Sequence, residues 1–530
     1  MSQKVLLVFL NTVFSLTVVS QSFQISDQMV YGGDSYDGIE NVVRALDGGY
    51  YMFCNSGSGQ TGNKTVSNWG GGDYWLIKTD SLFQNEWQIS FGSEADELVT
   101  KMLIDSNSNL YLCGSSYGGI SGNKTVDTYG ETDFWIIKTD PLGNEIWQKS
   151  YGGTENDTFR DGLIVDNKLF LIGGSNSGES GIKTGFNRGN TDYWLICADT
   201  AGNVVWDKTY GGTELDAAYR MSIDNSGDYL YVFGVSTSNI SYEKTEDCYG
   251  STDYWILKVS IETGDLIGDV TIGSEGHDIC WMGPNILFLE DYLYLLGSSY
   301  GDATGLKTEN SRGMNDYWLV KLNTNLDFIW DKTIGGNGQD DASSLLANQN
   351  KILIAGQSDS DAGFEKTEDN YFNYKDIWFV LIDTSGNILS DKTIGSDMPD
   401  MRTNLYKDDS GIIVGSSIFD SYVSGDFDAD VYGDYDAWIF RLTGVWTSLS
   451  ELNNDDKVTI YPNPAHSFVN IKLEDSKISI VNLYKVSGKC ILSQESTGPL
   501  SIDVSTLASG VYIIKILHER NIDRKILIVN

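Results

Sequence analysis

Side chains that could bind a ligand recur at one position of a repeated pattern. The chain carries seven Asp-x-Trp blocks, in which x is any residue. An aromatic or Arg side chain stands four residues before the Asp of each block. These side chains belong to Trp69, Tyr129, Arg188, Tyr249, Arg312, Phe372 and Tyr432. Aromatic and guanidinium groups on exposed loops can stack on sugar rings or peptide groups and lose little rotamer entropy. The spacing therefore predicts a ring-shaped ligand-binding face.

A lysine precedes the same Asp in six of the seven repeats. It stands nine residues before the Asp at Lys64, Lys124, Lys183, Lys244 and Lys307, and ten residues before it at Lys366. Such regularity favours a structural role, because a scaffold contact must be made in every repeat. On this second interpretation each Lys pairs with a repeat Asp and each aromatic ring caps its own repeat. A binding site is then expected where the pattern breaks.

The pattern breaks in the seventh repeat, where "GDFDADVYGDYDAW" has no Lys-Thr pair. Its carboxylates could converge on Ca²⁺, which takes about six to eight oxygen ligands. The stretch is not an EF-hand, since Val431 and Ala437 stand where Gly and Glu would be needed. A solvated acidic loop is the alternative, and Ca²⁺ is the one cofactor that the sequence suggests. The candidate ligands are Asp426, Asp428, Asp430 and Asp434.

The elements that must position these residues follow from the repeat. The Asp-x-Trp blocks recur at intervals of 59 to 63 residues, and a Gly-containing corner such as "YGGTEND" keeps the same period. Each period holds four short strand-like segments separated by turn residues, which predicts one propeller blade. In "DYWLIKTD" apolar residues occupy both parities, as in a strand buried on both faces. We therefore expect an all-β chain with a seven-bladed β-propeller over residues 21–443.

The two ends of the repeat predict how the ring closes. A corner comes before the first Asp-x-Trp block, whereas no corner follows the last one. The segment "QISDQMVYGG" is therefore expected to supply the fourth strand of the last blade, which would remove a free sheet edge.

An Asp also ends each corner, and catalytic residues are hard to find. The corner residues could ring one mouth of the channel, but an Asx-type turn with local backbone N–H groups is the favoured interpretation. Only His277 of the three His residues lies in the repeats, so no catalytic residue is assigned, although a carboxylate-pair glycosidase stays open. The corner residues are Asp37, Asp96, Asp157, Asp216, Asp278, Asp340 and Asp400.

The stretch "DFWIIKTDPLGNEIWQKSYGGTEND" followed by "GLIVDNKLFLIGGS" resembles the bacterial seven-bladed β-propeller repeat. The resemblance covers about residues 23–443 and departs from the usual short loops by its long Lys-Thr loop. It implies a fold and no single activity, because one fold hosts many functions.

The C-terminal segment loses the repeat after a linker, residues 444–457. The pieces "YPNPA", "VNLYKVSGK", "LASGVYIIKI" and "RKILIVN" resemble the type A C-terminal sorting domain of the Bacteroidetes type IX secretion system. The resemblance implies a small Ig-like β-sandwich over residues 458–530, export across the outer membrane and handling by the type IX machinery. An Ig-like adhesion module is the alternative. The motif residues are Tyr461, Pro462, Asn463, Pro464, Gly488, Lys489, Gly510 and Tyr512.

The N-terminus and the composition agree with export. Lys4 followed by an apolar run predicts a signal peptide over residues 1–20, and no later segment is apolar enough to span a bilayer. The net charge of −38 argues against nucleic acid as a partner, because the chain would repel a phosphate backbone. Cys54, Cys113 and Cys197 are expected to be small buried side chains, and the chain is expected to be a monomer.

The sequence thus favours a secreted or cell-surface binding protein whose ligand is a glycan or a protein. Two other functions stay open: a hydrolase or lyase that acts on polysaccharide, and a structural component of a surface layer.

Overall fold

The computed structural model describes residues 23–279, 285–372, 374–419, 424–446, 458–461, 464–473, 479–485, 490–496, 500–507, 510–518 and 521–529. The predicted signal peptide lies outside the described residues, as do Pro462, Asn463, Gly488 and Lys489. The chain divides into two compact units, Ser22–Val445 and a unit that contains Trp446–Asn530. No helix of the described residues is long and apolar enough to cross a membrane.

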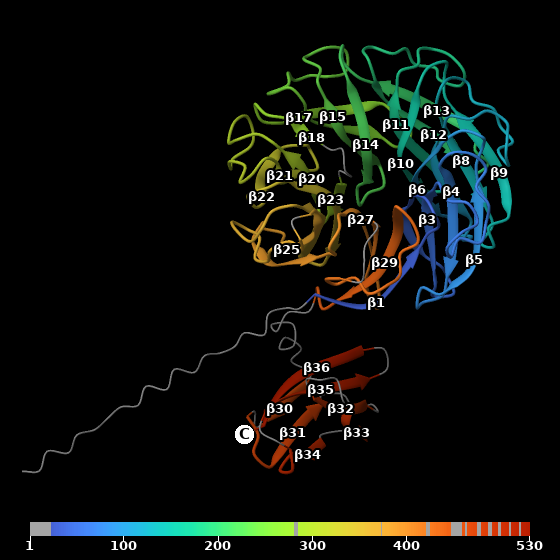
Figure 1. Cartoon of the computed structure of the whole chain (residues 1–530). Coiled ribbons are helices and arrows are strands. Elements are labelled where there is room, and N and C mark those ends of the chain that lie inside the picture. The colour runs from blue at the N-terminus through green and yellow to red at the C-terminus, as the bar shows by residue number, and fades with distance from the viewer. Residues whose placement is uncertain are drawn as a thin grey trace, which may run out of the picture. The chain divides into compact units, whose positions relative to one another are not determined.

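The first unit is built from antiparallel sheets that follow one another around a ring (Figure 1). Sheets 1 to 3 have the strand orders β2-β3-β4-β5, β6-β7-β8-β9 and β10-β11-β12-β13. Their strands are β2 (Asp37–Arg44), β3 (Tyr50–Ser56), β4 (Asp73–Thr79), β5 (Asn85–Phe91), β6 (Glu97–Ile104), β7 (Leu110–Ser116), β8 (Asp133–Thr139), β9 (Glu145–Tyr151), β10 (Asp157–Val165), β11 (Lys168–Ser175), β12 (Asp192–Asp199) and β13 (Val204–Tyr210).

Sheets 4 to 7 continue the series. Sheet 4 has the order β14-β15-β16-β17, sheet 5 the order β18-β20-β21-β22 with β19 on β20, sheet 6 the order β23-β24-β25-β26 and sheet 7 the order β27-β28-β29-β1. Their strands are β14 (Asp216–Ile223), β15 (Tyr229–Ser236), β16 (Asp253–Ser260), β17 (Leu266–Ile272), β18 (Asp278–Ile279), β19 (Asn285–Leu289), β20 (Tyr292–Ser299), β21 (Asp316–Asn323), β22 (Phe328–Ile334), β23 (Asp340–Asn348), β24 (Lys351–Ser358), β25 (Asp376–Asp383), β26 (Ile388–Ile394), β27 (Asp400–Asp408), β28 (Gly411–Phe419), β29 (Tyr435–Thr443) and β1 (Gln24–Tyr31).

The expected closure of the ring by the N-terminal segment is confirmed. β1 pairs antiparallel with β29, and Val30 stands opposite Trp438 although the two are far apart in sequence. Figure 1 shows β1 beside β29 at the place where the two ends of the series meet. The outer strand of sheet 7 therefore comes from the start of the chain, as the offset between corners and Asp-x-Trp blocks predicts.

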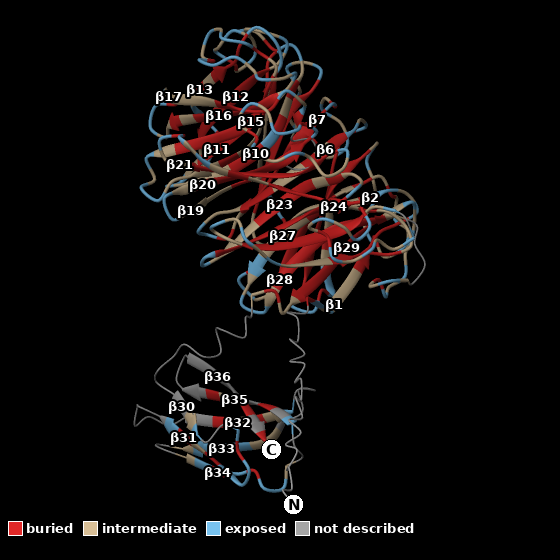
Figure 2. Ribbon diagram, turned by 90° about the vertical axis from the view of Figure 1, so that its left-hand side faces the viewer, coloured by how far each residue is buried: buried red, intermediate tan, exposed pale blue. Residues whose placement is uncertain are grey.

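Apolar cores fill the spaces between neighbouring sheets. In β4 every residue is buried, so Tyr74 and Trp75 face opposite neighbours as the apolar pattern predicts. The ring of Tyr74 lies 4.8 Å from that of Trp135 in sheet 2, and the same contact recurs between later sheets. Figure 2 shows the buried residues concentrated along the strands. The predicted burial of Cys54, Cys113 and Cys197 is also confirmed.

The connections between strands define two edges of this unit. Within a sheet, consecutive antiparallel strands are joined alternately at one edge and the other. The long connection between the second and third strands therefore shares an edge with the corner that leads to the next sheet, and we call it the loop edge. The opposite edge carries the two short hairpins of each sheet, and we call it the hairpin edge.

The second unit contains two antiparallel sheets, β30-β31-β34 and β33-β32-β35-β36. Apolar side chains from both sheets, including Val469 and Ile514, form one core. Of the predicted motif residues, Tyr512 is buried in this core, whereas Tyr461 and Pro464 are exposed and Gly510 begins β35. The strands are β30 (Val458–Tyr461), β31 (Phe468–Leu473), β32 (Ser479–Lys485), β33 (Cys490–Ser496), β34 (Leu500–Asp503), β35 (Gly510–His518) and β36 (Asn521–Val529).

Candidate functional site

The third strand of each sheet in the first unit has a buried Asp as its first or second residue, and this Asp holds the loop that precedes the strand. Asp73 is fully buried, and its Oδ2 accepts a hydrogen bond from the backbone N–H of Trp69 at 2.5 Å. The same bond recurs at Asp133, Asp192, Asp253, Asp316, Asp376 and Asp436. This Asp therefore has a structural role in each repeat. The bond fixes the backbone of six of the seven predicted ligand-binding residues, all except Phe372.

The sixth repeat corrects one residue of the predicted set. Asp376 accepts its loop hydrogen bond from Tyr371 rather than from Phe372. The loop is one residue longer in this repeat, so counting back four positions from the Asp selects the wrong residue. Phe372 is instead 67% exposed, with a φ of 52°.

The loop lysines are buried, and Lys64 shows the contacts that such a side chain makes. Lys64 Nζ lies 2.5 Å from Ser56 Oγ and 2.7 Å from Ser58 O, and it lies 5.3 Å from the centre of the Trp75 ring. Burial lowers the pKa of Lys64, while the nearby Asp37 opposes that shift. The predicted direct pairing of Lys with Asp is thus corrected, because a Ser hydroxyl stands between them and donates to Asp37.

In the seventh repeat a phenylalanine takes the place of this lysine. Phe427 stands nine residues before Asp436 and is almost completely buried. Its ring meets that of Trp438 edge-on, with centroids 5.5 Å apart. The break in the sequence pattern therefore exchanges a cation over the Trp ring for an aromatic ring against it.

The corner carboxylates bind the backbone of their own corners, as the Asx-type interpretation predicts. Asp157 Oδ2 accepts from Gly153 N at 2.6 Å, and the corresponding bonds recur in the other corners. The second corner corrects the sequence analysis, because Glu97 and not Asp96 accepts from Ser93 N at 3.0 Å. Asp96 instead accepts from Gly72 N.

The four predicted aromatic candidates other than Phe372 pack on the next sheet and stay partly exposed. Trp69 lies so close to Gly122 of sheet 2 that a Cβ added there would be 3.1 Å from the Trp69 Cβ. Tyr129, Tyr249 and Tyr432 pack in the same way against Gly181, Gly305 and Gly62. The four side chains are 41–48% exposed. Each ring therefore caps the following repeat rather than its own, which corrects that interpretation.

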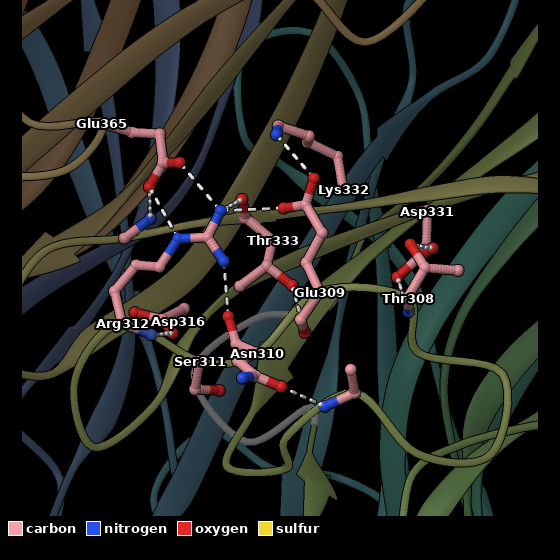
Figure 3. A network of polar contacts seen from close by, with 12 residues as sticks. Thr308, Glu309, Asn310, Ser311, Arg312, Asp316, Asp331, Lys332, Thr333 and Glu365 are labelled. Atoms are coloured by element: carbon pink, nitrogen blue, oxygen red, sulfur yellow. Dashed lines mark hydrogen bonds and ion pairs between the residues drawn. The ribbon is translucent and has the colours of Figure 1, made fainter.

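The two predicted Arg candidates make ion pairs with the next sheet. Arg188 lies 2.5 Å from Glu243 through Nε, and its side chain is only 9% exposed. Figure 3 shows Arg312 between Glu309 and Glu365, with both carboxylates 2.8 Å from its Nη2. Both guanidinium groups are thus matched by carboxylates of the chain. They act as contacts between sheets.

The acidic loop of the seventh repeat does not gather its carboxylates. Asp426 Oδ2 accepts from the Tyr371 hydroxyl at 3.1 Å, whereas Asp428, Asp430 and Asp434 are exposed. In the part of the chain that the structure describes, no group of three or more His, Cys, Asp or Glu side chains could hold a metal ion. Calcium binding at this loop therefore stays a prediction.

The innermost strands enclose a polar cavity that sequence reasoning missed. Its volume is about 240 Å³, and strands of all seven sheets line it. Lys101 Nζ lies 3.3 Å from Asp161 Oδ1 there, and Asp161 also accepts from Met221 N at 3.0 Å. Five of the residues that line the cavity lie at β-bulges: Asn41, Lys101, Asp161, Arg220 and Asn404. Asn41, Lys101, Asp161 and Arg220 follow one another at intervals of 59 or 60 residues with changing side-chain type, which is the signal that could have located them.

Among the described residues of the first unit, the exposed aromatic side chains lie only at the loop edge. Among its described residues, the exposed large apolar side chains of the hairpin edge are aliphatic, as at Leu46, Leu82 and Leu142. The exposed aromatic ones lie in loops or corners at Tyr36, Trp69, Tyr117, Tyr129, Phe186, Tyr242, Tyr249, Tyr300, Phe364, Phe372, Tyr374 and Tyr432. The loop edge is therefore the candidate ligand-binding surface.

The C-terminal residues match a family of export domains. Residues 459–530 match the family described as secretion system C-terminal sorting domain. The chain carries a type IX sorting domain. This domain indicates export by type IX secretion to the cell surface or the extracellular space.

Other similarities are distant. Over 292 residues the chain is 23% identical to the regulatory protein FlaEY of Caulobacter vibrioides, with 50% of this chain and 29% of that protein covered. The extracellular domain of a protein described as a one component system of B. thetaiotaomicron is 11% identical, with 96% and 59% covered and a TM-score of 0.39. Hydrazine synthase of Kuenenia stuttgartiensis is 9% identical, with 61% and 78% covered and a TM-score of 0.35. The chain thus spans less than a third of FlaEY.

Replacing Arg312 tests its assignment as a contact between sheets. We expect Arg312→Leu to lower the free energy of unfolding by about 2 kcal/mol, because Glu365 loses its ion-pair partner in a partly buried site and Glu309 keeps only Lys332. Urea denaturation measures the loss. Lys208→Ala, which breaks an exposed pair with Asp265, is the control and should cost less than about 0.5 kcal/mol. An Arg312→Leu variant with an unchanged free energy of unfolding would contradict the assignment.

We expect the first unit to lose stability as the pH rises from about 4 to 7, because buried Asp side chains at the starts of its strands have raised pKa values. Burial raises the pKa of Asp133 and Asp253 to about 6, and that of Asp376 to about 7. The folded state then binds more protons than the unfolded state in this window, so the free energy of unfolding falls with increasing pH.

Calorimetry between pH 4.5 and 8 should show a melting temperature that decreases and then levels off. Asp133→Asn can still accept the Tyr129 N–H and should make the decrease shallower. Asp140→Asn, at a hairpin carboxyl whose pKa is lowered by hydrogen bonds from Asn144, should leave the slope unchanged. A melting temperature that rises over this range would refute the raised pKa values.

Proposed function

We propose that the chain is a secreted or cell-surface binding protein, in which a closed seven-bladed β-propeller presents a ligand-binding face. The pairing of β1 with β29 and the four-stranded sheets support the propeller. On this proposal residues 1–20 are a signal peptide, 21–443 the propeller, 444–457 a linker and 458–530 the sorting domain. The type IX machinery is then the partner of the last segment.

The confinement of exposed aromatic side chains to the loop edge carries the binding role. Large exposed apolar groups on a folded surface mark interaction sites when they gather in one region. Here the buried Asp bonds fix the loop backbones, so the aromatic side chains would pay little entropy on binding. A glycan or a protein is the ligand class that such a surface fits.

A binding experiment on the full chain tests this proposal. We expect saturable capture on a glycan array or a protein array, and at least tenfold weaker capture after Trp69→Ala or Tyr129→Ala. Both substitutions leave the hydrogen bond from the loop N–H to the Asp in place. Leu142→Ala, on the hairpin edge and 68% exposed, is the matched control.

Two results would count against a binding role. One is the lack of saturable capture on either array. The other is release of a cleaved product from a captured glycan, since turnover would favour the hydrolase or lyase function instead.

A further inference from the structure

The loop of each repeat contains a four-residue turn that needs a left-handed residue at its second position. The turn is closed by a hydrogen bond such as Lys124 N to Ser121 O at 3.0 Å. Its second residue has a φ between 49° and 58° in all seven repeats. That residue is Gly62, Gly122, Gly181, Gly305 and Gly425 in five repeats, but Tyr242 and Phe364 in the other two.

Tyr242 and Phe364 occupy this position at a conformational cost. A left-handed backbone is open to Gly, whereas a bulky side chain there is an outlier. Burial does not compensate, because Tyr242 is 62% exposed and Phe364 is 69% exposed. Strained backbone conformations cluster at functional sites, so these two exposed rings are candidates for a role in binding.

Tyr242 belongs to a cluster between sheets 3 and 4. Its ring centre lies 6.1 Å from that of Phe186, and the Arg188 guanidinium carbon lies 4.6 Å from the Phe186 ring and 5.9 Å from the Tyr242 ring. Glu243 holds Arg188 through Nε and Nη2. A buried, paired guanidinium thus supports two rings whose outer surfaces face solvent.

Phe364 stands in the equivalent place between sheets 5 and 6. The residue after it, Glu365, pairs with Arg312 as Glu243 pairs with Arg188. Asn310 occupies the position of Phe186 there, two residues before the Arg. Aromatic-Glu-Lys turns therefore occur only opposite the two Arg loops, which makes the strained rings and the Arg–Glu pairs parts of one arrangement.

The charges around these rings select the class of ligand. Glu243 and Glu365 neutralise the guanidinium groups, and the chain carries a net charge of −38, so polyanions are repelled. Glu243 is 27% exposed and can still accept a hydroxyl, since a carboxylate offers about four lone-pair sites. A flat, neutral ring with hydroxyl groups fits this combination of an apolar face and free acceptors.

The spacing favours a repeating ligand over a folded partner. A stable protein interface covers about 800 Å² per partner in one patch. Here the strained rings lie at two separate boundaries, with the 4–5 boundary between them. A polymer of identical units can engage equivalent sites of this kind and gain affinity by doing so.

We propose that Tyr242 with Phe186, and Phe364 at the equivalent site, are stacking platforms for the pyranose rings of a neutral polysaccharide. This assignment rests on the proposed binding function and names its ligand class and its principal residues.

Affinity electrophoresis of the full chain tests the assignment. The gels contain xyloglucan, laminarin or galactomannan as neutral polysaccharides, with alginate as the anionic control. We expect at least one neutral polysaccharide to retard the chain and alginate not to do so. The double variant Tyr242→Gly, Phe364→Gly carries the residue of the other five repeats, so its apparent affinity should fall at least tenfold while its melting temperature stays equal or rises.

A second variant keeps the test independent of the turn. Phe186→Asn copies Asn310 and should weaken retardation without moving the turn backbone. The assignment is overturned if no neutral polysaccharide retards the chain, if the double variant binds as the parent does, or if the glycine changes lower the melting temperature. Capture of a protein on the array without retardation by any polysaccharide would overturn this assignment and leave the proposed binding function standing.

Discussion

A buried carboxylate at the start of each third strand is the constraint on which the loop edge depends. Asp73 and its six equivalents have almost no solvent exposure. Each accepts a hydrogen bond from the backbone N–H of a loop residue four or five positions before it. Burial of such a charge is costly unless hydrogen bonds compensate. The hydrogen bond from the loop therefore offsets part of the cost of burying the carboxylate. The same bond fixes the backbone of a long polar loop.

The same constraint separates what every repeat must keep from what it can vary. The Asp is present in all seven repeats, the buried Lys in six and the turn glycine in five, and each one completes the packing of its own loop. The residue that reaches to the next sheet varies with its partner, as Arg188 meets Glu243 and Tyr371 meets Asp426. Where both the partner and the turn residue change together, as at Tyr242 and Phe364, strained rings are held outward. The recurring Asp, Lys and Gly are therefore scaffold, whereas the exposed departures at Tyr242 and Phe364 form the surface that we propose for binding.

Most of the architecture could be predicted because its signals are periodic. The Asp-x-Trp spacing gave the number of repeats to expect, and the offset of the corners located β1 against β29. The site was less predictable because spacing along the chain does not say where a side chain points. Arg188 and Arg312 have the residue type of a binding group, yet carboxylates of the following sheet engage both. Because the sixth loop has one extra residue, Tyr371 and not Phe372 donates to the buried Asp. In the second corner Glu97 accepts the backbone hydrogen bond that was expected at Asp96. The turn glycines are visible in the sequence, but only the positive φ shows why Tyr242 is exceptional there.

Amide hydrogen exchange at Tyr129 tests the central claim most directly. Its N–H donates to Asp133, while its side chain is 48% exposed at the rim of the loop edge. If the buried carboxylate holds the loop, this amide should be protected to the same degree as amides of β8, and the Asp133→Ala change should abolish the protection. Exchange of the Tyr129 amide at the rate of an unfolded chain would contradict the account.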